Sequence, residues 1–148
     1  MARYTVDASV FMSAYNTYEV AHEVSRRLLE LMRQQGAPLI EPTLLLPEIA
    51  ASVARVYQDE VLARAFAASV GSLGHLTLMP VDELLADIAV QIAARHRLRG
   101  SDAVYAAVAQ RYGAVLVTLD QEQYNRVGRV LSTRTPAEAL ADMEGDEA

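Results

Sequence analysis

The sequence of 148 residues contains no cysteine, no tryptophan and no lysine. Without cysteine there can be no disulfide scaffold, cysteine-ligated zinc or iron–sulfur site, or thiol nucleophile, and this absence fits a reducing cytosol. All 13 basic residues are therefore arginine, which excludes a P-loop lysine, Schiff-base chemistry and a lysine base. Any contact with phosphate must come from arginine or from backbone amides.

Long apolar runs are also missing. No run approaches the roughly 20 residues that span a membrane, and the first residues, Met1-Ala-Arg-Tyr-Thr-Val-Asp7, lack the pattern of a signal peptide. We therefore expect a cytoplasmic protein with no membrane partner. A hydrophobic fraction of 52% argues against disorder, and the length suits one core, so a single domain over residues 1–148 is expected.

The net charge of −6 is unevenly distributed along the chain. Residues 137–148 form an acidic C-terminal tail with five acids and no base, so the remaining residues carry a net charge of −1. The charges of four other acids, Asp7, Glu48, Asp102 and Asp120, would be neutralised locally if these residues cluster around a metal ion. The overall acidity is therefore weak evidence against a nucleic-acid substrate.

Short apolar runs alternate with segments of helical periodicity. The predicted strands are residues 3–6, 38–41, 76–79, 114–117 and 129–132. Helices are predicted between them, and a last helix at 136–143 ends in the frayed acidic tail. This alternation predicts a three-layer α/β/α sandwich, with a central, mainly parallel sheet of about five strands and right-handed crossovers.

The most informative stretch is residues 98–120. Ser101 is a favourable N-cap, which places Asp102 in the first turn of a helix, where the dipole favours an anion. Gly113 ends this helix, and a short apolar strand then leads to Asp120. Asp120 thus follows a strand end, the edge at which α/β sheets form their sites.

Two more acids are expected at the same edge. Asp7 ends the first strand, and Glu48 lies early in the helix after the second strand. Together with Asp102 and Asp120 they would repel one another, and their pKa values would rise, unless a cation lay among them. Mg²⁺ prefers hard oxygen ligands and keeps positions for water and phosphate, so the group predicts a divalent-metal site for phosphoryl chemistry.

Each acid also has a purely structural explanation. Asp7 could only cap a helix, and Asp120 fits a capping box with Gln123. Asp102 could only complement the helix dipole, and Glu48 could be a solvated helix residue. Their coincidence at one edge, rather than any one of them, favours the metal site.

Neutral and basic side chains near these acids are further candidates. Ser9 and Thr118 could each bond a metal-bound water or simply cap a backbone group. Arg95, Arg97 and Arg99 could follow a nucleic-acid backbone. They could equally be a solvated helix end, where the dipole favours cations.

This pattern resembles the PIN-domain ribonucleases, specifically the VapC-type toxins of prokaryotic toxin–antitoxin modules. The matching stretches are Val6-Asp-Ala-Ser-Val10, Pro47-Glu-Ile-Ala50, Leu98-Arg-Gly-Ser-Asp-Ala-Val-Tyr-Ala-Ala-Val-Ala109 and Val117-Thr-Leu-Asp120. The resemblance covers nearly the whole chain, and the third stretch is its most specific part. The acidic tail is not explained by the family pattern.

The resemblance implies a PIN-like fold and an Mg²⁺- or Mn²⁺-dependent endoribonuclease that leaves a 5′-phosphate and a 3′-hydroxyl. It implies catalytic roles for Asp7, Glu48, Asp102 and Asp120, with the three aspartates as metal ligands. Ser9 and Thr118 would support them. A homodimer and a cognate antitoxin protein are also implied. The alternative is a catalytically silent PIN-like module that only binds RNA or protein.

Overall fold

The computed structural model describes residues 1–147. In chain order the elements are β1 (Tyr4–Val6), α1 (Ala8–Tyr15), α2 (His22–Gln35), β2 (Leu39–Pro42), α3 (Leu45–Tyr57), α4 (Glu60–Gly71), β3 (Leu76–Met79), α5 (Glu83–His96), α6 (Gly100–Tyr112), β4 (Val115–Val117), α7 (Gln121–Val127), β5 (Thr133–Arg134) and α8 (Pro136–Glu147). No helix in this described part has the length and apolar character needed to cross a bilayer.

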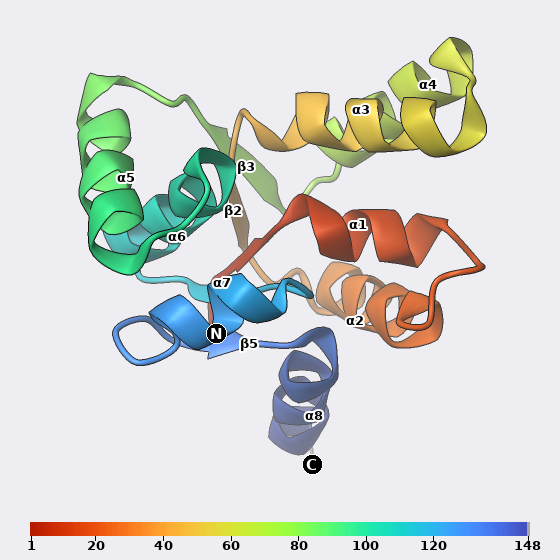
Figure 1. Ribbon diagram of the computed structural model, residues 1–148. Coiled ribbons are helices and arrows are strands. Elements are labelled where there is room, and N and C mark those ends of the chain that lie inside the picture. Colours follow the sequence, from red (N-terminus) through yellow and green to blue (C-terminus); the bar gives the residue numbers. More distant parts are fainter. Residues whose placement is uncertain (148) are drawn as a thin grey trace.

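The five strands form one parallel sheet in the order β3-β2-β1-β4-β5. Helices α1 to α4 lie on one side of this sheet, and α5 and α6 lie on the other (Figure 1). The predicted three-layer α/β/α fold with a parallel five-stranded sheet is therefore confirmed.

The order of the strands reverses between β1 and β4. From β1 the chain adds β2 and β3 on one side, and the crossover through α5 and α6 then brings it back to the other side of β1. The carboxyl ends of β1 and β4 lie side by side there, because Val6 pairs with Val117. Such a reversal opens a crevice at the carboxyl edge of an α/β sheet. Asp7 and residues 118–120 emerge at this point.

Helix α6 is buried on nearly all sides. It contacts β1, β2 and β4 on one side and α5 on the other. Its buried residues are Ala103, Tyr105, Ala106, Ala107, Val108 and Ala109. Four of these are alanines, whose short side chains allow the helix backbone to approach the sheet closely. The helix that carries Asp102 is therefore fixed by packing relative to β1 and β4.

Two predictions about element ends are wrong. Helix α6 begins at Gly100 with Arg99 as its N-cap, so Ser101 lies in the first turn instead of capping it. Residues 129–132 form no strand. Backbone amides of Val130 and Leu131 both donate to the Val127 carbonyl, so these residues form the turn after α7, and β5 follows it.

Helix α8 continues to Glu147, four residues beyond the end predicted at Met143. Helix α8 packs against α2. Its buried residues are Pro136, Ala139, Leu140 and Met143. Asp142 lies 3.0 Å from Arg134, and Glu144 lies 3.6 Å from Arg27. Exposed ion pairs of this kind contribute little, so the apolar contacts hold the helix in place.

A buried carboxyl side chain interrupts the sheet between β1 and β2. Glu41 is fully buried on β2, and its Oε2 accepts the Val6 amide at 2.6 Å, a donor that would otherwise bond a backbone carbonyl. The Ile40 carbonyl instead accepts the Thr5 hydroxyl at 2.8 Å. Glu41 Oε1 has no partner among the described residues. Burial, with the nearby Asp7 charge, raises the pKa of Glu41 well above 4.5.

We predict that Glu41 makes the folded protein less stable as the pH rises. Between its unfolded pKa near 4.5 and its raised folded pKa, the folded chain keeps a proton that the unfolded chain has released. The free energy of unfolding then falls with rising pH, by up to about 1.4 kcal/mol per pH unit. Urea denaturation of Glu41→Gln from pH 4.5 to 7.5 should lack this slope.

The matched control is Glu19→Gln, which removes an exposed carboxyl from the loop between α1 and α2. It should keep the slope of the parent protein. Parallel pH profiles for the parent and Glu41→Gln would contradict the prediction.

Candidate active site

One cavity of about 310 Å³ contains all the predicted acids. It lies at the carboxyl edge of the sheet, where β1 and β4 end. Its charged lining residues are Asp7, Glu48, Arg55, Arg99, Asp102 and Asp120. Ser9, Ser52, Ser101 and Tyr105 are among its polar lining residues. Four carboxyl groups thus share one cavity with two guanidinium groups.

Asp7 is the most enclosed of these carboxylates, with 4% of its surface exposed. It caps α1, because Oδ1 accepts the Ser9 amide at 3.0 Å. The Ser9 hydroxyl also donates to Oδ1, and the Thr118 hydroxyl donates to Oδ2. The pKa of Asp7 is raised to about 6, because burial and the charge of Asp102 raise it by more than the two hydroxyls lower it.

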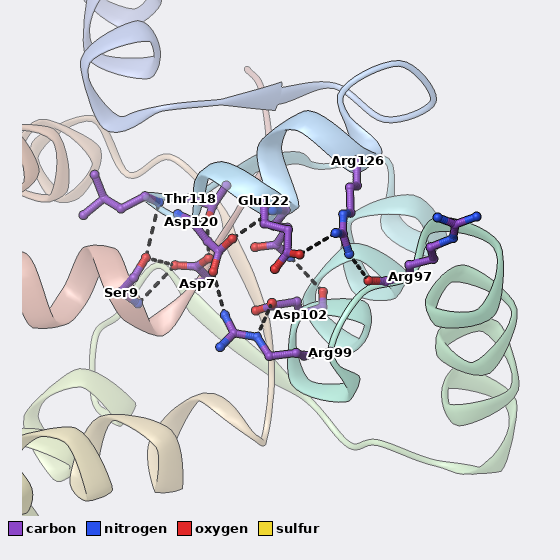
Figure 2. Close-up of polar contacts among 11 residues, drawn as sticks. Asp7, Ser9, Arg97, Arg99, Asp102, Thr118, Asp120, Glu122 and Arg126 are labelled. Atoms are coloured by element: carbon purple, nitrogen blue, oxygen red, sulfur yellow. Dashed lines mark hydrogen bonds and ion pairs between the residues drawn. The ribbon is translucent and has the colours of Figure 1, made fainter.

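The same two hydroxyls join the ends of β1 and β4. Ser9 Oγ accepts the Leu119 amide at 3.3 Å, and Thr118 Oγ1 accepts the Asp120 amide at 2.9 Å. Each hydroxyl therefore donates to Asp7 and accepts from the loop after β4 (Figure 2). The structural explanation of Asp7 as a cap is correct, but the carboxylate also lines the cavity.

Asp102 and Asp120 are bridged by one arginine. Arg99 Nε donates to Asp102 Oδ2 at 3.2 Å, and Arg99 Nη2 donates to Asp120 Oδ2 at 2.6 Å. Figure 2 shows the guanidinium group between the two carboxylates. Partial burial raises the pKa of Asp102, Arg99 opposes this shift, and the charges of Asp120 and Glu48 add to it.

The capping box predicted at Asp120 forms only in half. Asp120 Oδ1 accepts the Gln123 amide at 2.9 Å, as a cap does. The Gln123 side chain does not return to Asp120. Its Nε2 donates to the Asp102 carbonyl at 2.8 Å, because Gln123 is fully buried beside the start of α6. This bond ties α7 to the turn that carries Asp102.

Glu48 is oriented by a residue that the sequence analysis did not select. The Tyr105 hydroxyl donates to Glu48 Oε1 at 2.6 Å. Burial and this contact raise the pKa of Tyr105, so its hydroxyl remains a donor. Tyr105 lies three residues after Asp102 on α6 and therefore on the same helix face. That spacing is the signal that could have identified it.

The three arginines predicted beside the acids separate in space. Arg95 lines a different cavity, of about 120 Å³, together with Val130. Arg97 is the C-cap of α5, its carbonyl accepts a bond from Arg126, and its side chain points away from the carboxylates (Figure 2). Of the three, Arg99 reaches the acidic cavity.

The donor set suits a hard divalent cation. Across residues 1–147, no three His, Asp or Glu side chains lie close enough, as placed, to bind one ion between them. Mg²⁺ needs only one or two carboxylates and completes its shell with water. The charges of Asp120 and Glu48 raise the pKa of Asp102, and the charge of Asp102 raises the pKa of Asp7. Asp102 therefore interacts with each of the other three carboxylates. The groups of the cavity that could bind a cation are all oxygens, which suits a hard divalent ion such as Mg²⁺ or Mn²⁺.

Comparison with known structures shows the same fold in several solved proteins. VapC20 from Mycobacterium tuberculosis, described as a toxin that cleaves the sarcin–ricin loop, has a TM-score of 0.71 and 19% identity over 84% of this chain and 94% of its own. PAE2754 from Pyrobaculum aerophilum has a TM-score of 0.72 and 20% identity over 97% and 90%. DNA-bound VapBC from Salmonella typhimurium has a TM-score of 0.65 and 17% identity over 92% of this chain and 99% of its own.

No curated protein matches the sequence. The model of the PIN domain family matches residues 4–130, which include the four carboxylates of the cavity. The chain therefore belongs to the PIN domain family.

Proposed function

We propose that this protein is a metal-dependent endoribonuclease that acts as the toxin of a toxin–antitoxin module. The observation that carries the proposal is the shared cavity of Asp7, Glu48, Asp102 and Asp120 at the strand reversal. Membership of the PIN family and the likeness to VapC toxins, one described as cleaving the sarcin–ricin loop, support it.

Asp7, Asp102 and Asp120 would hold the ion together with water molecules, because no three carboxylates of the described residues lie close enough, as placed, to enclose it alone. Ser9 and Thr118 would fix Asp7. A bound Mg²⁺ or Mn²⁺ supplies a water of lowered pKa and stabilises charge on the phosphoryl group. The water oxygen would form a bond to phosphorus as the bond from phosphorus to the 3′ oxygen breaks, the 3′ oxygen would take a proton from solvent, and a 5′-phosphate and a 3′-hydroxyl would result.

Glu48 would accept the proton of the attacking water. Tyr105 holds one of its oxygens, Oε1, and so fixes the orientation of the carboxylate within the cavity. A proton acceptor must lie within hydrogen-bond reach of the proton it takes, which makes this orientation part of the chemistry.

RNA would be held by arginine, because the chain has no lysine. Arg55 and Arg99 line the cavity itself. Arg55 lies seven residues after Glu48 on α3, which places both on one face of that helix. Arg95 and Arg97 stay predictions as RNA contacts outside the cavity.

The antitoxin partner is supported by a solved toxin–antitoxin complex and by VapBC structures that share this fold. A second cavity, of about 320 Å³, lies between α1, α2 and α4 and is mainly apolar. Phe11, Leu29, Phe66 and Leu73 line it, and Arg26, Glu30 and Arg33 lie at the same cavity. It suits an apolar side chain from an amphipathic antitoxin segment. The homodimer and the cytoplasmic location stay predictions.

We predict that Asp102→Asn abolishes RNA cleavage while the fold is kept. Loss of an outer contact to a metal ligand costs roughly 10–100-fold in activity, so loss of the central carboxylate should cost at least about 100-fold. The assay measures cleavage of a mixed RNA pool by the parent protein with Mg²⁺ or Mn²⁺, by the parent with EDTA, and by Asp102→Asn with either metal. Circular dichroism checks that both proteins are folded.

Asp142→Asn is the matched control, because it makes the same change in an exposed ion pair on α8. It should cleave like the parent. Equal cleavage by Asp102→Asn and the parent would refute the assignment. RNA binding without cleavage under any metal would favour the silent binding module.

We predict that Tyr105→Phe lowers cleavage by about 10–100-fold, since it removes the donor that orients Glu48. Single-turnover cleavage at saturating metal measures the effect. Tyr124→Phe is the control, because the Tyr124 hydroxyl contacts Glu138 at 3.1 Å, outside the cavity. An unchanged rate in Tyr105→Phe would show that the orientation of Glu48 does not depend on this hydroxyl.

A further inference from the structure

Arg99 makes the closest charged contacts within the acidic cavity. Its Nη2 lies 2.6 Å from Asp120 Oδ2, and its Nε lies 3.2 Å from Asp102 Oδ2. The side chain is 69% exposed, whereas the two carboxylates are 14% and 23% exposed. One cation, reached from solvent, thus neutralises two carboxylates that are themselves largely enclosed.

These two oxygens belong to two of the three proposed metal ligands. A carboxylate oxygen that accepts a guanidinium N–H at these distances has its lone pair directed at the arginine. A divalent ion that takes the same oxygens must displace the guanidinium. Arg99 and a divalent ion would therefore bind the same carboxylate oxygens and neutralise the same negative charge.

We propose that Arg99 is a built-in competitor of the divalent metal: it occupies Asp102 and Asp120 and is released when the ion binds. This inference rests on the proposed metal site. The competition sets the metal concentration at which the site fills, and it keeps the carboxylates paired at lower concentrations. The released guanidinium remains at the cavity, where an RNA phosphate would arrive.

The position of Arg99 makes the exchange easy. It is the N-cap of α6, outside the buried part of that helix, and its own side chain forms no cap bond. Because the side chain is mostly exposed, it can leave by rotation without moving α6. The carboxylates stay in place, because Asp102 lies on the packed helix and Asp120 caps α7 through the Gln123 amide.

Arg55 provides a matched comparison within the same cavity. It lines the cavity, but no hydrogen bond or ion pair of its side chain is found among the described residues. Removing Arg55 therefore changes the charge of the cavity without freeing Asp102 or Asp120. A purely electrostatic effect would appear in both variants, whereas competition appears only at Arg99.

The first test is Mn²⁺ affinity, measured by electron paramagnetic resonance at pH 8 and low salt, with no RNA present. Two exposed ion pairs correspond to about two- to thirtyfold in an equilibrium constant, so Arg99→Gln should bind Mn²⁺ tighter by that factor. Arg99→Lys, which keeps the charge but loses the two-pronged contact, should fall between. Arg55→Gln should change the affinity less than about twofold.

The second test observes the release directly. The Nε–H signal of Arg99, assigned by its loss in Arg99→Gln, should shift in nitrogen-15 spectra during titration with Mg²⁺. Arg26 is the internal control, because it contacts Glu23 on α2 through Nε at 3.2 Å and Nη2 at 2.7 Å. Its signal should not move.

The outcomes separate this inference from the proposed function. Mn²⁺ binding that is lost in Asp102→Asn but equal or weaker in Arg99→Gln would overturn the competition and leave the metal site standing. An Arg99 signal that stays fixed at saturating Mg²⁺ would overturn it as well. No Mn²⁺ binding in the parent or in any arginine variant would refute the metal site, and the competition with it.

Discussion

The carboxylate of Asp7 is held out of water by hydroxyls that also hold the neighbouring strand end. A buried carboxylate is costly unless hydrogen bonds satisfy it. Ser9 and Thr118 meet that requirement, and through Leu119 and Asp120 they fix the loop that follows β4. The geometry of the cavity therefore depends on one enclosed acid at the point where the sheet reverses.

The cavity also balances opposing charges locally. Each acid has a hydrogen-bond donor: hydroxyls for Asp7, a phenol for Glu48, and one guanidinium that Asp102 and Asp120 share. Because these partners differ in chemistry, the acids differ in how readily a cation can take them. The hydroxyl and phenol contacts orient Asp7 and Glu48, whereas the guanidinium of Arg99 neutralises the charges of Asp102 and Asp120.

Local signals in the sequence were enough to bring the four acids together. Strand ends and helix starts are encoded within a few residues, and parallel topology then aligns them at one edge. The contacts between elements were not predictable in this way. Tyr105 meets Glu48 across 57 residues of sequence, and Arg99 reaches Asp120 across 21. Strand β5 was misplaced because a strand of two residues carries no periodicity.

The buried Glu41 has a consequence for the mechanics of the sheet. Among the described residues, β1 pairs with β2 at one position, Tyr4 with Leu39, but with β4 at three. The sheet is therefore joined by few backbone hydrogen bonds along the line between β2 and β1, with β3 and β2 on one side of this line and β1, β4 and β5 on the other. Glu48 follows β2, whereas Asp7 and Asp120 follow β1 and β4. The two walls of the cavity thus follow strands joined by few backbone hydrogen bonds, so the packing of α6 on β1, β2 and β4 holds these walls together more than the sheet itself does.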